Sequence, residues 1–213
     1  HKGDSKSILL AELKRIHQKK WINSKRLDKT GAVKLYRAQN GGGYTIEAEL
    51  GLIPNGIADP DFMGWEIKQF AVKKCLLIKS KPLTLLTPET DGGYNVDDGV
   101  AAFMRKYGYP SPTVNDRLDF TGRHFYGEIC AKSGLTLVTT GYDSKTDTIT
   151  DAEGCVALID GSDNVASSWS IAKLMGHWKR KHARAAYIPA LSQHNADKTR
   201  SYFYCNNVRL FEV

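Results

Sequence analysis

The sequence has few cysteines, and their spacing argues against two common kinds of small-protein stabilisation. Its 213 residues contain four cysteines, at positions 75, 130, 155 and 205. No two of them form a CxxC pair, so the spacing argues against a structural zinc site. A chain of this length buries enough apolar surface to fold without disulfides. We therefore predict reduced thiols and a cytoplasmic protein.

Long hydrophobic runs are also missing. The longest unbroken apolar runs, such as Val156–Ile159, are far shorter than the roughly 18 residues that a membrane span needs. No apolar stretch follows the N-terminal lysines in the way a signal peptide requires. We expect no membrane partner. Because the first residue is His1 and not Met, we expect a processed chain or a fragment of a larger protein.

The overall composition is that of a folded globular protein. Hydrophobic residues make up 41% of the chain and charged residues 25%, which excludes a disordered tail, a collagen and a coiled-coil rod. The net charge of +7 is unevenly distributed. Residues 1–37 carry a net +8 and residues 173–213 a net +6, whereas residues 38–172 carry a net −7. Two basic arms therefore flank an acidic centre, a pattern suited to holding phosphates beside carboxylate-bound metal ions. Solvated helix faces explain such charge equally well.

Apolar periodicity and turn residues predict a mixed α/β protein. A glycine run at positions 41–43 predicts a break, and Gly51 suits the left-handed end of a short helix. The expected helices span residues 7–20, 44–50, 100–107 and 168–182, with Ser168 capping the last. The expected strands lie around residue 61 and over residues 65–72, 75–78, 83–86, 125–130, 135–140, 155–159, 185–191, 202–205 and 208–211.

We expect a single domain over residues 1–213. Residues 1–86 and 173–213 would form its catalytic core and DNA-contacting arms, and residues 87–172 a possible inserted lobe.

The informative block contains Asp61, followed at +5 by Glu66 and at +7 by Lys68. Residues two apart on a strand share a face, so Glu66 and Lys68 project together. If the chain reverses at Met63-Gly64, Asp61 lies beside Glu66. Two adjacent carboxylates are costly unless a divalent cation separates them, and oxygen ligands favour Mg²⁺. The alternative is ordinary surface charge on a hairpin, but the strand reads as buried, where charges need a partner.

These residue types in this order suit metal-assisted hydrolysis of a phosphodiester. Asp61 and Glu66 would hold Mg²⁺, with Mn²⁺ as a possible substitute, and Glu47 would complete the ligand set or help to hold a second ion. Such an ion polarises a phosphate and lowers the pKa of a bound water. Lys68 on the same face would orient that water or stabilise charge on the phosphoryl oxygens.

Pro60-Asp61…Glu66-Ile67-Lys68 resembles the PD-(D/E)XK nuclease signature. The longer pattern, with Thr30-Gly31, Glu47, Leu50-Gly51 and Asp61-Phe62-x-Gly-x-Glu66-x-Lys68, is similar to the MvaI/BcnI restriction endonucleases and, more distantly, to the nicking enzyme MutH. The resemblance covers about the first third of the chain. It implies a restriction-endonuclease-like core, with a central mixed β-sheet flanked by helices and a DNA-recognition lobe. It also implies a monomer acting on double-stranded DNA at a short specific sequence.

Several basic residues are candidates for contacting DNA. Arg200 lies with His194 and Lys198 in a polar loop before the last strands, although an ordinary solvated loop is an equal alternative. Cations at a helix C-terminus are favourable without any ligand, which weakens the case for residues 179–182. The DNA-binding candidates are Lys25, Arg26, Lys179, Arg180, His194, Lys198 and Arg200, with Arg117, Arg123 and His124 as a weaker group.

The leading hypothesis is a Mg²⁺-dependent endonuclease of the type II restriction kind. One alternative within the same chemistry is a MutH-like nicking or repair endonuclease, or the nuclease domain of a larger protein. A non-catalytic DNA-binding module is the alternative of another class, and the intact set of Asp61, Glu66 and Lys68 argues against it.

Overall fold

The computed structural model describes residues 4–54, 59–76, 83–85 and 87–212. The chain divides into two compact units, unit 1 (His1–Leu85 and Trp178–Val213) and unit 2 (Leu86–His177). No helix in the part of the chain that is described is both long and apolar enough to cross a membrane.

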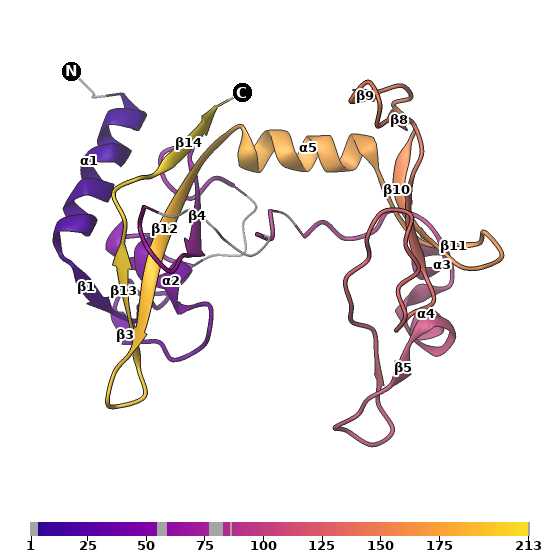
Figure 1. Ribbon diagram of the computed structural model, residues 1–213, viewed down its shortest axis with the longest axis horizontal. Coiled ribbons are helices and arrows are strands. Elements are labelled where there is room, and N and C mark those ends of the chain that lie inside the picture. Colours follow the sequence, from indigo (N-terminus) through magenta and orange to yellow (C-terminus); the bar gives the residue numbers. More distant parts are fainter. Residues whose placement is uncertain (1–3, 55–58, 77–82, 86, 213) are drawn as a thin grey trace. The chain divides into compact units, whose positions relative to one another are not determined.

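Unit 1 is built on a five-stranded mixed sheet whose central strand is β12 (Arg184–His194; Figure 1). The first residues of β12 pair with antiparallel β14 (Arg209–Glu212), and its last residues pair with antiparallel β13 (Arg200–Tyr204). Strand β4 (Glu66–Ala71) runs parallel to β12, and β1 (Trp21–Asn23) pairs with β13. The predicted central mixed sheet is confirmed.

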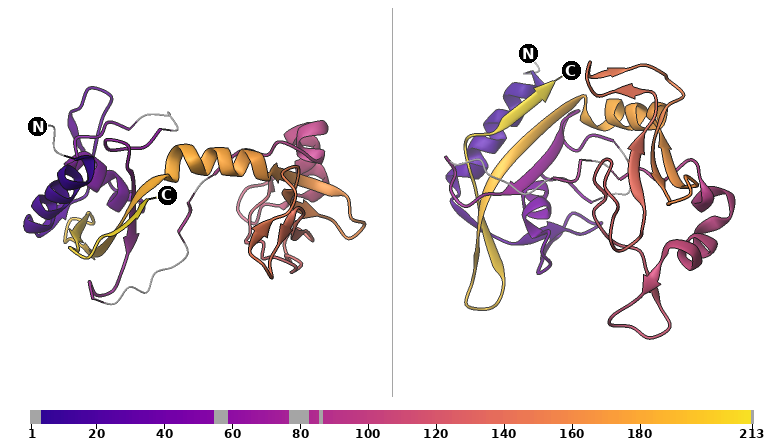
Figure 2. Two further views of the ribbon diagram at one scale, coloured as in Figure 1. Left: turned by 90° about the horizontal axis from the view of Figure 1, so that it is seen from above. Right: turned by 45° about the vertical axis from the view of Figure 1, so that its right-hand side comes forward.

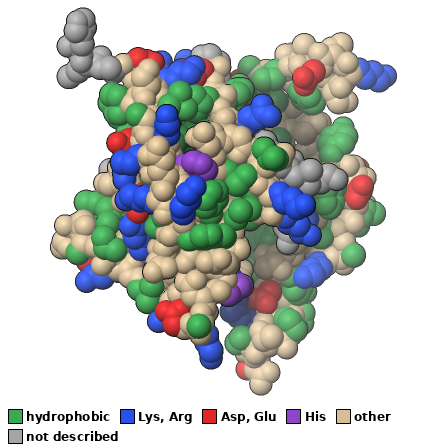
Figure 3. Space-filling model, turned by 60° about the vertical axis from the view of Figure 1, so that its left-hand side comes forward, with side chains coloured by type: hydrophobic (Ala, Val, Ile, Leu, Met, Phe, Trp, Pro, Cys, Tyr) green, Lys and Arg blue, Asp and Glu red, His purple; other side chains and the backbone are tan. Residues whose placement is uncertain are grey.

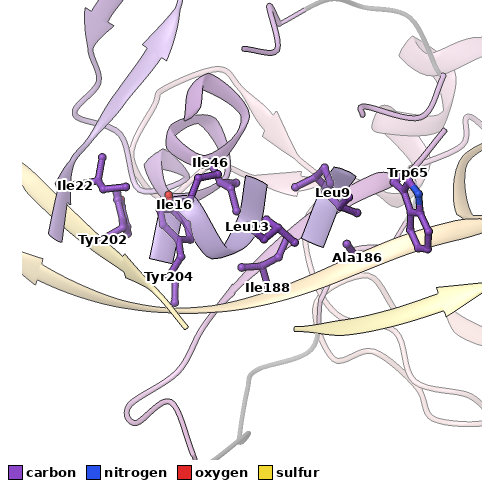
Figure 4. Close-up of a cluster of buried hydrophobic side chains, with 12 residues drawn as sticks. Leu9, Leu13, Ile16, Ile22, Ile46, Trp65, Ala186, Ile188, Tyr202 and Tyr204 are labelled. Atoms are coloured by element: carbon purple, nitrogen blue, oxygen red, sulfur yellow. The ribbon is translucent and has the colours of Figure 1, made fainter. Parts of the chain in front are cut away.

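Helix α1 (Ser5–Gln18) lies against one face of this sheet (Figures 1 and 2). Leu9, Leu13 and Ile16 recur at helical spacing, so they share one side of the helix. Each is at most 5% exposed, and together they pack against Ile188 of β12 in the main core of the unit (Figure 4). The helix expected over residues 7–20 is therefore present, with slightly different ends.

Helix α2 (Gly41–Glu49) begins inside the glycine run that was expected to be a break. The glycines belong to the first turn because the helix packs very closely there. A Cβ on Gly41 would lie 2.5 Å from Ser24 Oγ, and one on Gly42 only 2.4 Å from Gln69 Oε1. Gly51 follows the helix with a φ of +74°, as predicted for a left-handed C-terminal residue.

Unit 2 is a smaller α/β body with its own core. Strands β7 (Thr136–Thr139), β10 (Cys155–Ile159) and β11 (Val165–Ser170) form an antiparallel sheet. Phe103, Tyr107 and other side chains of the unit form its buried cluster. The remaining elements of unit 2 are α3 (Tyr94–Asp97), α4 (Gly99–Tyr107), β5 (Tyr109–Pro110), β6 (Leu118–Asp119), β8 (Tyr142–Asp143) and β9 (Thr148–Ile149).

The prediction of reduced thiols is wrong for two of the four cysteines. Cys75 and Cys205 form a disulfide, with their Cα atoms 5.5 Å apart. The sheet brings them together, since Ala71 near the first cysteine pairs with Ala190 of β12, and Ala190 pairs with Tyr204 beside the second. Cys130 and Cys155 are free.

The last helix starts later than expected. Ser168 is not its cap, because residues 165–170 pair with β10 as strand β11. Helix α5 (Ile171–His182) follows directly, and the Oγ of Ser170 accepts a hydrogen bond from the backbone N–H of Lys173 at 3.1 Å. Cross-strand pairing therefore displaced the helix start by a few residues.

Four expected strands are not formed as predicted. Residues 125–130 make only isolated bridges, at Tyr126 and Ile129. The segment around residue 61 makes only the bridge between Phe62 and Trp65. Residues 83–85 have no strand, and Cys75 lies in a turn. The rest of these last two predictions, residues 77–78 and 86, lies outside the described residues.

Candidate active site

A tight reversal positions Asp61. Phe62 and Trp65 exchange two backbone hydrogen bonds of 2.9 and 2.8 Å around Met63 and Gly64. Both turn residues have positive φ, +49° and +87°, which is the geometry of a two-residue hairpin turn that follows the strand twist. The reversal carries Asp61 back to β4, where its Oδ2 accepts a hydrogen bond from the backbone N–H of Ile67 at 2.9 Å. The predicted bend at Met63-Gly64 is confirmed.

Glu66 and Lys68 project together from β4, as their spacing predicts. Lys68 Nζ lies 2.9 Å from Glu66 Oε1, and the two side chains are 23% and 2% exposed. Trp65 and Ile67 alternate with them and enter the main core. One face of this strand thus anchors the segment, while the other presents a buried carboxylate with its lysine.

Glu47 reaches the same place from α2. Glu47 and Asp61 line a cavity of about 410 Å³ within unit 1, together with Tyr44 and Lys181. Burial raises the pKa of Glu47 to about 7, and the negative charges of Asp61 and Glu66 add to the rise. The structure therefore brings together the acidic residues that the sequence placed 19 positions apart.

The carboxyl groups repel one another in the absence of a cation. Burial raises the pKa of Asp61, and the nearby charge of Glu66 raises it further, against the hydrogen bond from Ile67. Glu66 Oε2 is buried without a hydrogen-bond partner. A buried acceptor left unpaired costs free energy, which a bound cation removes. These properties fit a divalent metal ion.

No group of three His, Cys, Asp or Glu side chains that could hold a metal ion occurs among the described residues. This does not conflict with a magnesium site, because Mg²⁺ keeps several waters and is usually bound through one or two protein carboxylates. Asp61 and Glu66 offer two such carboxylates, and the negative charge of Glu66 and Asp61 also acts on Glu47.

We predict that the metal-free protein loses stability as the pH rises from 4.5 to 7. Glu47 has a pKa of about 7 in the folded protein and an ordinary value of 4.5. Between these pH values Glu47 is protonated in the folded state and ionised in the unfolded state. The free energy of unfolding therefore falls as the pH rises through this window. We expect a loss of roughly 1–3 kcal/mol, measured by urea denaturation in EDTA.

Glu47→Gln supplies the control for this titration, because an amide does not ionise. The difference in unfolding free energy between the two proteins should change across the window and level off on either side of it. A constant difference from pH 4.5 to 8 would show that Glu47 does not titrate as proposed.

Lys181 is the residue that the sequence analysis missed at this site. It belongs to the last turn of α5, and its Nζ lies 3.6 Å from Glu66 Oε1. The sequence did not indicate it because Lys181 follows Lys68 by 113 positions. Its only signal was membership in the basic run 179–182, for which the helix C-terminus provides a sufficient explanation.

Lys25, a candidate for contacting DNA, forms an ion pair with Glu49 within the fold. Glu49, whose side chain is 3% exposed, forms ion pairs with Lys19, Lys25 and Arg15. Burial alone would raise the pKa of Glu49, but hydrogen bonds from Lys19 and Lys25 outweigh it and lower the pKa. Glu49 of α2 thus links Arg15 of α1 and Lys25 of β2 (Lys25–Leu27) within the fold. Arg26 is exposed, with its guanidinium 5.4 Å from the centre of the Tyr36 ring.

The other candidates lie at two places in unit 1, the last turn of α5 and the β12–β13 hairpin. Lys179 and Arg180 are exposed in the last turn of α5. His194 and Arg200 are directly paired across β12 and β13, and Lys198 lies in the turn that joins those strands. The hairpin therefore gathers three of the predicted residues at its tip. Figure 3 shows Lys and Arg side chains in several separate groups on the surface.

The weaker group lies in unit 2 and is partly engaged. Arg117 Nε lies 2.8 Å from Asp119 Oδ1. His124 Nε2 is 2.8 Å from Ser133 Oγ, and its ring stacks on Phe120. Arg123 is exposed.

Comparison with known proteins now decides the family. The model of the MvaI/BcnI restriction endonuclease family matches residues 10–212. The chain belongs to the MvaI/BcnI restriction endonuclease family. No curated protein matches the sequence. The family resemblance inferred from the first third of the chain is therefore confirmed over nearly its whole length.

One of two similar solved structures supports the fold that the family implies. A structure described as the restriction endonuclease MvaI–cognate DNA substrate complex superposes with a TM-score of 0.68 at 18% identity, covering 100% of this chain and 76% of that one. A structure of MvaI in the absence of DNA has a TM-score of 0.39 at 18% identity, covering 99% and 75%. The first likeness shows the restriction-endonuclease fold, and membership of the MvaI/BcnI family supports a DNA nuclease.

Proposed function

We propose that the protein is a Mg²⁺-dependent endonuclease that cuts double-stranded DNA at a short specific sequence, in the manner of a type II restriction enzyme. The observation that carries the proposal is the convergence of Asp61, Glu66 and Lys68. Within this group, Glu66 Oε2 is buried without a hydrogen-bond partner. Family membership supports the same activity.

Each residue has a distinct proposed role. Asp61 and Glu66 would hold the metal ion, with Glu47 as a further acidic residue of the cavity. When bound, the ion supplies Lewis-acid polarisation of the phosphate and a more acidic water. Lys68, fixed 2.9 Å from Glu66, would orient the attacking water and stabilise negative charge on the phosphoryl oxygens.

DNA contacts are proposed for the tip of the β12–β13 hairpin, where His194, Lys198 and Arg200 gather. The planar guanidinium of Arg200 is suited to a guanine edge, and Lys198 to a phosphate. Arg26, Lys179 and Arg180 are exposed and available to phosphates. We propose that unit 2 contributes sequence reading, because the family resemblance implies a DNA-recognition lobe beside the catalytic core. The MvaI structure of the same fold is described as a complex with its cognate DNA.

Supercoiled plasmid provides the test. With Mg²⁺ we expect discrete linear fragments, and with EDTA no change in the plasmid. A relaxed circle as the final product would replace the proposal with a nicking enzyme. A gel shift without cleavage in Mg²⁺, Mn²⁺ or other divalent ions would replace it with a DNA-binding module. Asp61→Asn protein purified in the same way serves as the blank for contaminating nucleases.

A further inference from the structure

Lys181 brings a second ammonium group to the acidic site, in addition to that of Lys68. Lys181 lines the cavity beside Glu47 and Asp61, and its Nζ is 3.6 Å from Glu66 Oε1. Lys68 Nζ is 2.9 Å from the same oxygen. Glu66 Oε1 thus has two lysine neighbours, whereas Glu66 Oε2 is buried without a hydrogen-bond partner.

The position of Lys181 is fixed by the residues around it. The next residue, His182, is fully buried, and its Nε2 lies 2.6 Å from the carbonyl oxygen of Leu85. The ring of His182 also stacks on Trp178, one turn earlier, with centroids 4.7 Å apart. The helix end is therefore anchored within unit 1. Lys181 is directed into the cavity, whereas its neighbours Lys179 and Arg180 are exposed.

The charges at the cavity and next to it show what a second lysine contributes. Glu47 and Asp61 line the cavity with Lys181, and Glu66, which contacts Lys181, adds a third carboxylate together with its partner Lys68. The charge of Lys181 opposes the rise in pKa at both Glu47 and Asp61. An ammonium group beside the carboxylates stabilises the metal-free site, and it competes with any divalent cation for the same oxygens.

A lysine in this position also suits a phosphate. Its ammonium is a compact charge on a flexible stem, and only 26% of the Lys181 side chain is exposed, so a contact to an anion is partly desolvated and strong. The stem allows the ammonium to leave Glu66 without any movement of the helix.

Given the proposed nuclease activity, on which this inference rests, we propose that Lys181 is a phosphate-binding residue of the active site. It pairs with Glu66 in the metal-free protein and binds a non-bridging oxygen of the scissile phosphate when DNA is present. Lys181 is therefore a temporary counter-ion whose removal favours metal binding and impairs DNA cleavage.

The test compares Lys181→Ala and Lys181→Arg with wild type. Lys179→Ala, from the same helical turn, is the control for metal affinity, and Lys14→Ala is the control for cleavage. Calorimetric titration with Mn²⁺ in the absence of DNA measures metal affinity. We expect Lys181→Ala to bind the ion about 3–10-fold more tightly, because a competing cation is gone. Its single-turnover cleavage in Mg²⁺ should be about 10²-fold slower, with partial rescue by Lys181→Arg.

The opposite signs of the two effects separate this role from a structural one. A lysine that only supports the fold would weaken metal binding and cleavage together, and that result overturns the inference. Cleavage by Lys181→Ala within twofold of wild type also overturns it. Wild-type protein that binds Mn²⁺ but cuts no DNA would end the proposed nuclease function. In that case an unchanged Mn²⁺ affinity in Lys181→Ala would still end the counter-ion role. Lys179→Ala should match wild type in Mn²⁺ affinity, because its exposed side chain does not line the cavity. Lys14→Ala, at an exposed position of α1, should match wild type in cleavage.

Discussion

Asp61→Asn should reduce DNA cleavage by about 10³-fold or more while making the metal-free protein more stable. The amide keeps an oxygen that can accept the hydrogen bond from the backbone N–H of Ile67, which is 2.9 Å long in the structure. It removes the negative charge that burial and Glu66 make unfavourable, as the raised pKa of Asp61 shows. If Asp61 holds the metal ion as proposed, loss of its charge costs several kcal/mol of transition-state stabilisation.

Plasmid cleavage in Mg²⁺ and thermal unfolding in EDTA at pH 8 measure the two effects. We expect the melting temperature of Asp61→Asn to rise by about 2–4 °C. Asp59→Asn is the matched control, because Asp59 is exposed and two residues away, and we expect little change in either measurement. Cleavage by Asp61→Asn within tenfold of wild type would remove Asp61 from the proposed site.

Breaking the Cys75–Cys205 disulfide should destabilise the protein by about 3–5 kcal/mol. The bond joins residues 130 positions apart, and constraining so long a loop removes much of the entropy of the unfolded chain. The loop contains the whole of unit 2, so the bond joins the two chain segments of unit 1 directly. Urea denaturation with and without reductant, and of Cys75→Ser/Cys205→Ser, measures the loss.

Cys130→Ser/Cys155→Ser is the control for this change, since both of those cysteines are free. We expect this pair of substitutions to alter the unfolding free energy by less than about 1 kcal/mol. Thiol titration of the unfolded, unreduced protein should find two free thiols. A titre of four would contradict the disulfide.

The local geometry of the candidate site was predictable because it depends on neighbours in sequence. A two-residue reversal at Met63-Gly64 and the alternation of a strand are enough to place Asp61, Glu66 and Lys68 on adjoining positions. Burial of Trp65 and Ile67 in the core directs Glu66 and Lys68 to the opposite face of the strand. Helix ends were less predictable, since α5 begins only where pairing of β11 with β10 ends.

The partners of these residues were not predictable in the same way. Nothing in the pattern around Lys25 indicates that a buried carboxylate at Glu49 will hold it, and this pair exists because α2 packs against β2. The glycine run was interpreted as a break because glycine disfavours helices. Close packing against Ser24 and Gln69 made it the start of one.

The sequence by itself determined the mixed α/β class and the Asp61–Glu66–Lys68 arrangement, because both depend on short-range periodicity and spacing. The family was indicated by a motif resemblance and shown by the match to the family model. Only the tertiary structure decided that Lys181 enters the acidic cavity and that Cys75 bonds to Cys205. Both contacts join segments more than 100 positions apart. Such contacts follow from how strands β4, β12 and β13 pair, and that pairing depends on the free energy of the whole sheet and not on any one segment.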